Sequence, residues 1–76
     1  MTHRHVNLLT LNYLALKKER ERLGLTVAEL AYRSNLAPMQ VKDLEDYVST
    51  NPTLKTISKL TRGLGKETDP LFLLRW

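Results

Sequence analysis

The chain has 76 residues, of which 42% are hydrophobic and 26% are charged, and it contains no cysteine. This length allows one small globular domain, and the lack of cysteine excludes disulfide bonds and thiolate zinc sites. The formal charge of +4 permits a nucleic-acid partner without requiring one. The longest apolar runs, such as Leu71 to Leu74, are far shorter than the roughly 20 residues of a membrane span, so we expect no membrane partner.

The first helix is predicted by a charged segment of good helix formers, residues 17–23, followed by Gly24. Glycine just past a helix end commonly adopts the left-handed conformation that stops the helix. Either Thr10 or Asn12 could cap the start. The apolar face of this helix should consist of residues at spacing i, i+4 and i+7, namely Leu16, the stem of Arg20, and Leu23.

The second and third helices are short. Thr26 is expected to cap the second one, because Glu29 three residues later completes a capping box. Asn35 tolerates the left-handed conformation and ends this helix after about two turns. Pro38 then starts the third helix, since proline fits the first helical position. The residues expected to face inward are Val27, Leu30, Ala31, Val41 and Leu44.

A fourth helix follows the loop at residues 49–52. Thr53 caps it, Gly65 ends it, and Gly63 inside it should cost about 1 kcal/mol relative to alanine. Its apolar stripe is expected to contain Leu54, Ile57, Leu60 and Leu64. Asp69 and Pro70 start a fifth helix of one or two turns over residues 71–76. We therefore predict an all-α fold of five short helices, with residues 1–9 as an N-terminal extension and residues 10–76 as a single helix-turn-helix domain.

The second and third helices, joined by a tight turn at residues 35–37, form the candidate helix-turn-helix. From about Leu16 to Phe72 the chain resembles the lambda-repressor-like (Cro/XRE-type) helix-turn-helix domains. The resemblance is carried, at matching spacing, by Arg20, Gly24, Leu25, Thr26, Leu30, Ala31, Val41, Leu44, Glu45, Pro52, Leu54, Ile57, Leu60, Leu64, Gly65, Leu71 and Phe72. It implies a compact domain that binds double-stranded DNA, and an ion pair between Arg20 and Glu45. The residues alone leave open that these two charges are separately solvated.

In such a domain the third helix lies in the major groove, with its first residues against the base edges. The side chains expected to contact bases are Met39, Gln40, Lys42 and Asp43. The residues expected to contact phosphates are Thr26 and Val27 through the helix N-terminus, Arg33, and Thr50 and Asn51 in the loop. Further Lys and Arg on the first and fourth helices are either phosphate contacts or solvated surface; they are Lys17, Lys18, Arg22, Lys55, Lys59 and Arg62.

The C-terminal segment 71–76 is apolar at five of its six positions. One face of a two-turn helix buries only about half of these, and an exposed apolar patch usually marks an interface. In this family the C-terminal helix commonly forms a two-fold dimer. We therefore expect a homodimer whose interface contains Leu71, Leu73, Leu74 and Trp76, unless both ends of the chain only complete the small core. A second apolar run could extend the first helix, cover the core or contact a partner; it consists of Val6, Leu8, Leu9 and Leu11.

No site for catalysis, a metal or a cofactor is expected. His3 and His5 have no carboxylate or cysteine nearby, so they do not make a metal site. The sequence has no nucleophile with a matching base, no paired carboxylates and no glycine-rich phosphate loop. We therefore predict a protein that is not an enzyme.

Two functions remain. The first, implied by the resemblance, is a homodimeric, sequence-specific repressor of bacterial, phage or plasmid type, located in the cytoplasm. The second is a protein-interaction module on the same fold, such as an antitoxin, with weak or no DNA binding. The second function is favoured by Val27, where the family often has glutamine, and by the acidic end of the third helix, which contains Asp43, Glu45 and Asp46. Pro38 and Tyr47 also depart from the family, which frequently has a polar residue and glycine there, and these departures weaken the expectation of tight DNA binding. The loop from Ser49 to Thr53 also lacks any basic residue.

Overall fold

A computed structural model of the protein describes residues 11–48 and 52–75. Within these ranges the chain is helical and has no strand. The elements are α1 (Tyr13–Arg22), α2 (Val27–Ser34), α3 (Pro38–Glu45), α4 (Leu54–Gly63) and a 3-10 helix, η1 (Phe72–Leu74). The all-α class is confirmed, but the prediction of five α-helices is wrong, because the described residues form only four.

The C-terminal segment forms a 3-10 turn because its backbone is tied to the start of α1. The N–H of Leu74 donates to the carbonyl of Leu71 at 2.9 Å, a bond between residues three apart. The carbonyl of Leu73 accepts the N–H of Asn12 at 2.8 Å, and the Asn12 side-chain amide donates to the carbonyl of Arg75 at 2.6 Å. A helix this short has too few internal hydrogen bonds to offset its nucleation cost, so these tertiary bonds determine its conformation.

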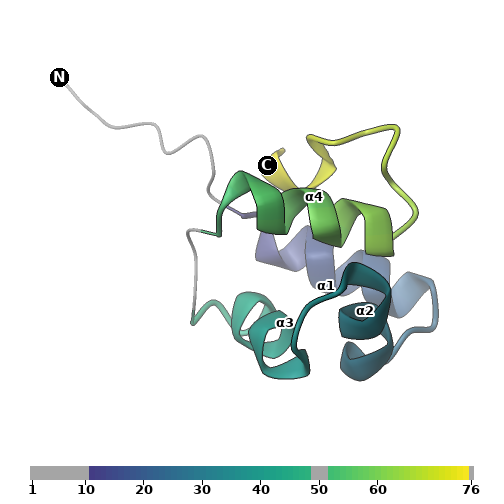
Figure 1. Ribbon diagram of the computed structural model, residues 1–76, viewed down its shortest axis with the longest axis vertical. Helices are drawn as coiled ribbons and strands as arrows, with labels where there is room; N and C mark the ends of the chain where they lie inside the picture. The colour runs from purple at the N-terminus through teal and green to yellow at the C-terminus, as the bar shows by residue number, and fades with distance from the viewer. Residues whose placement is uncertain (1–10, 49–51, 76) are drawn as a thin grey trace, which may run out of the picture.

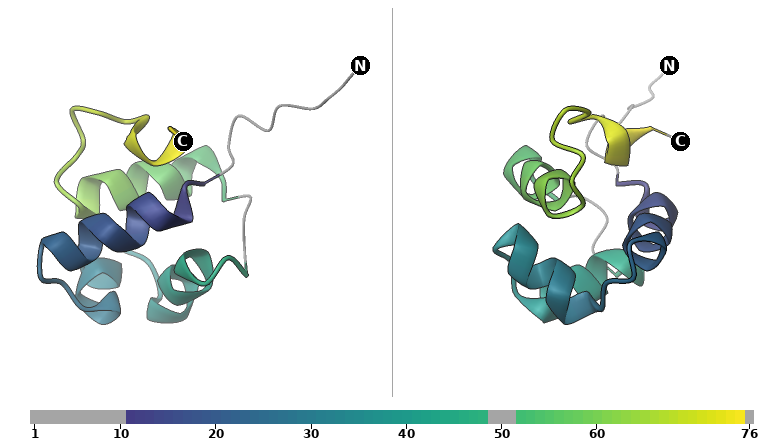
Figure 2. Two further views of the ribbon diagram at one scale, coloured as in Figure 1. Left: turned by 180° about the vertical axis from the view of Figure 1, so that it is seen from behind. Right: turned by 90° about the vertical axis from the view of Figure 1, so that its right-hand side faces the viewer.

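Figures 1 and 2 show α2 and α3 on one side of the molecule and η1 on the other, with α1 and α4 between them. In this arrangement α2 contacts α3 and α4, α1 contacts α3, and η1 contacts α1 and α4. The helix-turn-helix is therefore supported from behind by the two longest helices, and its outer side faces solvent.

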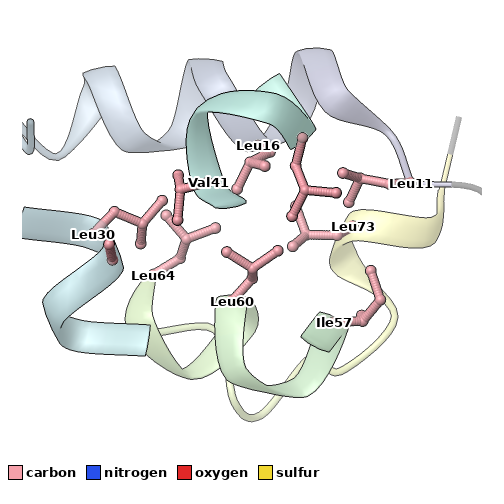
Figure 3. Packing of buried hydrophobic residues seen from close by; sticks show 10 residues of the cluster. Leu11, Leu16, Leu30, Val41, Ile57, Leu60, Leu64 and Leu73 are labelled. Atoms are coloured by element: carbon pink, nitrogen blue, oxygen red, sulfur yellow. The ribbon is translucent and has the colours of Figure 1, made fainter. Parts of the chain in front are cut away.

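One hydrophobic core connects all the helices (Figure 3). Leu16 of α1, Val41 of α3, and Leu60 and Leu64 of α4 converge in its centre. Burying each of these side chains contributes about 1.5–3 kcal/mol relative to leaving it exposed. The core residues are Leu11, Leu16, Leu30, Ala31, Val41, Leu44, Ile57, Leu60, Leu64 and Leu73.

The predicted starts of the first four helices are confirmed. Asn12, Thr26 and Thr53 are the N-caps of α1, α2 and α4, and each side chain accepts a backbone N–H from the first turn of its helix. Pro38 is the first residue of α3. Gly24 has φ 72°, the left-handed conformation expected after α1.

Two residues predicted on apolar faces are exposed instead. Leu23 is 37% exposed and Leu54 is 58% exposed, whereas Leu16 and Ile57 on the same two helices are fully buried. Leu23 is the C-cap of α1, and Leu54 is the first residue of α4. Both therefore lie at helix ends, where no facing helix covers them.

A buried carboxylate joins α1 to the segment after α4. Glu19 is 7% exposed, and it accepts a hydrogen bond from Arg22 Nε at 2.9 Å. Lys66 Nζ lies 3.5 Å from Glu19 Oε2 and 5.1 Å from the centre of the Phe72 ring, which adds a cation–π contact. The hydrogen bond from Arg22 lowers the pKa of Glu19 below its usual 4.5, although burial opposes this shift.

The lowered pKa of Glu19 predicts a loss of stability in acid. The unfolded chain takes up the proton at the usual pKa near 4.5, whereas the folded chain takes it up only at lower pH. The contribution of Glu19 to the free energy of unfolding is therefore fully present above pH 4.5 and is lost as the pH falls through the folded pKa. Urea unfolding between about pH 7 and pH 3 should show a shallower decline for Glu19→Gln than for the wild type. Equal declines would contradict this role.

Candidate nucleic-acid interface

The turn between α2 and α3 fixes the angle between these helices. Asn35 adopts the left-handed conformation, with φ 56° and ψ 46°, as predicted. The N–H of Leu36 then donates to the carbonyl of Ala31 at 2.9 Å, which closes the end of α2. Leu30 of α2 and Val41 of α3 are both fully buried in the common core. These contacts hold the outer face of α3 in one orientation.

The first turn of α3 presents two unengaged side chains. Met39 is 64% exposed, and Gln40 is also exposed. Within residues 11–48 and 52–75 neither side chain makes a hydrogen bond or an ion pair. Both are therefore available to a ligand that approaches the start of α3.

The charged residues further along α3 are engaged with one another. Lys42 Nζ lies 2.8 Å from Asp46 Oδ2, one helical turn away. Their hydrogen bond raises the pKa of Lys42 and lowers that of Asp46. Asp43 is half-buried. The four residues predicted to contact bases therefore differ in the structure. Within the described residues the side chains of Met39 and Gln40 have no hydrogen bond or ion pair, Lys42 is paired with Asp46, and Asp43 is half-buried.

The N-terminus of α2 is closed by its capping box. The N–H of Thr26 donates to Glu29 Oε1 at 2.7 Å, and the N–H of Glu29 donates to Thr26 Oγ1 at 3.0 Å. The backbone N–H of Thr26, predicted as a phosphate donor, is therefore already occupied by a carboxylate. Among the described residues, the N–H groups of Val27 and Ala28 have no such acceptor. A phosphate at this end would meet these two donors and the nearby Glu29.

Of the other residues predicted to contact phosphates, the structure describes only Arg33, which does not lie at this end. Arg33 lies near the C-terminus of α2, about 9 Å along the helix axis from Val27. Its Nε donates to the carbonyl of Gly63 at 2.7 Å, so the side chain covers the C-terminus of α4. Thr50 and Asn51 lie outside the described residues.

A bidentate ion pair ties α1 to the end of α3. Arg20 Nε donates to Glu45 Oε2 at 2.6 Å, and Arg20 Nη2 donates to Glu45 Oε1 at 3.0 Å. The third donor of the same guanidinium, Nη1, reaches the carbonyl of Leu25 at 2.7 Å. The side chains are 12% and 4% exposed, and the hydrogen bonds to Glu45 raise the pKa of Arg20. This cluster fixes α3 relative to both α1 and the α1–α2 turn.

The apolar C-terminal residues do not share one surface. Leu73 is fully buried in the core of its own chain, Leu74 is half-buried and Leu71 is 56% exposed. Trp76 lies outside the described residues. Within residues 71–75 the exposed apolar surface therefore comes from Leu71 and from parts of Phe72 and Leu74.

Two exposed aromatic residues were not identified from the sequence as functional. Tyr32 is 88% exposed and borders a shallow hollow on the outer face of α2, together with Leu25 and Ala28. The spacing i, i+3 and i+7 of these three residues could have indicated an exposed apolar strip. Tyr47 has φ 63°, so it keeps the left-handed conformation for which the family uses glycine, and its ring lies 4.5 Å from that of Tyr13.

Neither a membrane span nor a metal site is found in the part of the chain that the structure describes. No helix there is long and apolar enough to cross a membrane. No group of three His, Cys, Asp or Glu side chains there could hold a metal ion. His3 and His5 lie outside the described residues.

Comparison with known proteins agrees with this geometry. Residues 16–71 match the helix-turn-helix family HTH_3. The crystal structure of the wild-type restriction-modification controller protein C.Esp1396I is similar, with a TM-score of 0.72 and 32% identity over 90% of this chain and 86% of that one. Two point mutants of that protein give TM-scores of 0.74 and 0.69, at 30% and 33% identity, over 91% and 76% of this chain and 85% and 74% of theirs. No curated protein sequence matches. Because the family match covers more than half of the sequence, the chain belongs to the Cro/XRE-type helix-turn-helix family of DNA-binding transcriptional regulators.

Proposed function

We propose that the protein is a homodimeric repressor that binds a palindromic operator in double-stranded DNA, with α3 in the major groove. The observation that carries this proposal is the pair Met39 and Gln40, exposed and unengaged in the first turn of a rigidly held α3. A glutamine amide can donate to and accept from adenine, and a methionine side chain can pack on a thymine methyl group. Blocking a promoter by occupying the operator requires no catalytic group.

The other contacts follow from the same placement. The N–H groups at the start of α2, including that of Val27, would bind a backbone phosphate. Thr26 would contribute its hydroxyl, and Thr50 and Asn51 would contact the phosphate beyond α3. Lys42 would contact guanine or a phosphate after leaving Asp46, and Asp43 would accept from a cytosine amino group. Arg33 would add a phosphate contact through its terminal nitrogens, at a place away from the groove that α3 enters.

Selection of bound sequences from random duplexes, at near-physiological salt, tests the proposal. We expect a palindromic sequence to be enriched by the wild type and not by the Met39→Ala, Gln40→Ala double variant. The variant should bind the enriched site at least roughly 30-fold more weakly, since two base contacts of about 1–3 kcal/mol each contribute at least about 2 kcal/mol of discrimination together. Circular dichroism must show both proteins folded. A folded wild type that enriches no sequence contradicts the repressor.

The proposed dimer has its own test. We propose that Leu71, Leu74 and Trp76 form its interface, and that residues 10–76 are the domain, with residues 1–9 as an extension. Replacing Leu71 by glutamate places a charge on the interface without touching the core, since Leu71 is 56% exposed. Light scattering should give twice the chain mass for the wild type and the single mass for Leu71→Glu. Equal masses for the two proteins would contradict this interface.

Similarity to C.Esp1396I, a restriction-modification controller protein, suggests the genes of a restriction-modification system as the regulated class. A cytoplasmic location in a bacterium follows from a DNA target of this kind.

A protein-binding regulator is the second candidate, and the outer face of α2 favours it. Tyr32 is 88% exposed beside an apolar hollow, and such patches usually mark interfaces. The selection from random duplexes also distinguishes the repressor from the protein-binding regulator. A protein-binding regulator without DNA binding would be folded yet enrich no sequence, and Tyr32→Ala would then abolish capture of the partner.

A further inference from the structure

The net positive charge of the chain lies mainly away from the outer face of α3. Lys42 is paired with Asp46, and Glu45 is paired with Arg20, so α3 itself carries the uncompensated charge of Asp43. The arginine and lysine residues that form no ion pair within residues 11–48 and 52–75 are Lys17, Lys18, Arg33, Lys55, Lys59 and Arg62. Three of these six lie on α4.

These three residues form a stripe along one face of α4. Lys55, Lys59 and Arg62 are spaced i, i+4 and i+7, so they lie above one another over roughly 10 Å of the helix. Residues 54–63 contain no Asp or Glu that could neutralise them. Lys55 and Arg62 are exposed, and Lys59 is half-buried. We call this set the α4 stripe.

Arg33 extends the α4 stripe from the neighbouring helix. Its Nε donates to the carbonyl of Gly63, the residue after Arg62, at 2.7 Å. Gly63 faces α2, because a Cβ built on it would lie 2.0 Å from Ser34 Oγ. Lys59 lies one turn before Gly63, on the same row of the helix. The α4 stripe therefore borders the line where α2 and α4 meet, with the Arg33 guanidinium at its end.

We propose that the α4 stripe and Arg33 bind the phosphate backbone of double-stranded DNA at a place separate from the groove entered by α3. Regularly spaced cations on a helix that contains no Asp or Glu suit a strand of phosphates. A protein interface would need an apolar centre and would disfavour lysine, and the stripe has no apolar residue at its spacing. Figures 1 and 2 show α4 behind α2 and α3, in the layer between them and η1, so the phosphates that the α4 stripe would reach lie away from the outer face of α3. The inference rests on the proposed DNA-binding function.

The salt dependence of DNA binding tests this proposal. Each phosphate neutralised by a protein cation adds about 0.9 to the slope of log K against log salt concentration. The Lys55→Gln, Lys59→Gln double variant should therefore lower the slope by about 1.8 per bound protomer, and adding Arg62→Gln should lower it by about 2.7 per protomer in total. The preference for the enriched operator over random duplex should stay unchanged. Fluorescence anisotropy with both duplexes over a series of KCl concentrations measures these quantities.

The matched control is Lys17→Gln with Lys18→Gln, which removes two exposed and unpaired charges from α1. Equal slopes for the two double variants would overturn the proposal, because the stripe would then act only through net charge. The stripe variant could instead show the same salt slope for DNA binding as the wild type and lose binding to an acidic protein. That result would overturn the DNA proposal in favour of a protein partner. A lower slope on random duplex, in a protein that enriches no operator, would sustain the stripe and contradict the repressor.

The length of the duplex identifies the source of the phosphates. If the α4 stripe contacts the flanks of the operator duplex, the slope difference appears only with a duplex extended beyond the operator. If it contacts a second duplex, wild type bound to an immobilised operator retains a labelled random duplex that the stripe variant does not. Absence of both effects overturns the proposal.

Discussion

Replacing Glu45 by alanine is expected to lower the free energy of unfolding by about 3 kcal/mol, because it leaves the guanidinium of Arg20 buried without its partner. The Arg20 side chain is only 12% exposed, and among the described residues it would keep the carbonyl of Leu25 as its hydrogen-bond acceptor. In a domain of this size the loss corresponds to roughly 15 °C in Tm. Urea and thermal unfolding followed by circular dichroism measure both quantities.

The neighbouring carboxylate provides the matched control. Glu21 Oε2 lies 3.9 Å from Nη2 of the same guanidinium, but its side chain is 57% exposed. Such an exposed contact contributes little, so Glu21→Ala should change stability by less than about 0.5 kcal/mol. Similar losses for Glu45→Ala and Glu21→Ala would show that the buried geometry has no special role.

The ion pair is also expected to orient α3. Replacing Arg20 by methionine and Glu45 by leucine together removes both charges, so the fold should lose much less stability than in Glu45→Ala. The angle of α3 would then depend on apolar contacts alone. We expect this double variant to stay folded and to bind the enriched operator more weakly than the wild type does. Unchanged operator binding would limit the pair to a structural role.

Local signals in the sequence predicted the helix boundaries well. Asn12, Thr26 and Thr53 each cap a helix through a bond to a residue three positions later, so their effect depends on adjacent sequence alone. The left-handed residue Asn35 and the first-turn proline Pro38 act equally locally. The prediction of a fifth helix was wrong because the carbonyl of Leu73 accepts a hydrogen bond from Asn12, a residue 61 positions away in sequence.

The candidate DNA-binding surface was less predictable because several of its polar groups have more than one possible hydrogen-bond partner. Lys42 could face DNA or Asp46, and the spacing of four residues already allowed the second. Arg33 could not be placed from sequence, since its acceptor is the carbonyl of Gly63, thirty positions later. The sequence predicted the capping box of Thr26 but not its effect on phosphate binding. The Glu29 carboxylate accepts the backbone N–H of Thr26, which was predicted to donate to a phosphate.

Gly63 shows how packing can reverse a local preference. The sequence marks it as a weak point of α4, since alanine forms helix better by about 1 kcal/mol. In the structure α2 and α4 approach so closely there that a Cβ would lie 2.0 Å from Ser34 Oγ and 3.1 Å from Leu30 Cδ1. Within the described residues Ser34 Oγ is buried and has no hydrogen-bond partner. The close approach thus has a cost at Ser34 and is possible only with glycine at position 63.

Gly63→Ala is therefore expected to lower the free energy of unfolding by about 2 kcal/mol, the overpacking cost exceeding the gain in helix propensity. Ser58→Ala is the control, because Ser58 is exposed on the same helix and should gain a few tenths of a kcal/mol. Removing the hydroxyl in Ser34→Ala, Gly63→Ala should recover roughly 1 kcal/mol, since it relieves the shortest contact and an unpaired buried oxygen. Urea unfolding of the four proteins measures these differences. If Gly63→Ala is as stable as Ser58→Ala, helix propensity determines the effect of the substitution at position 63, and the close contact of α2 with α4 does not.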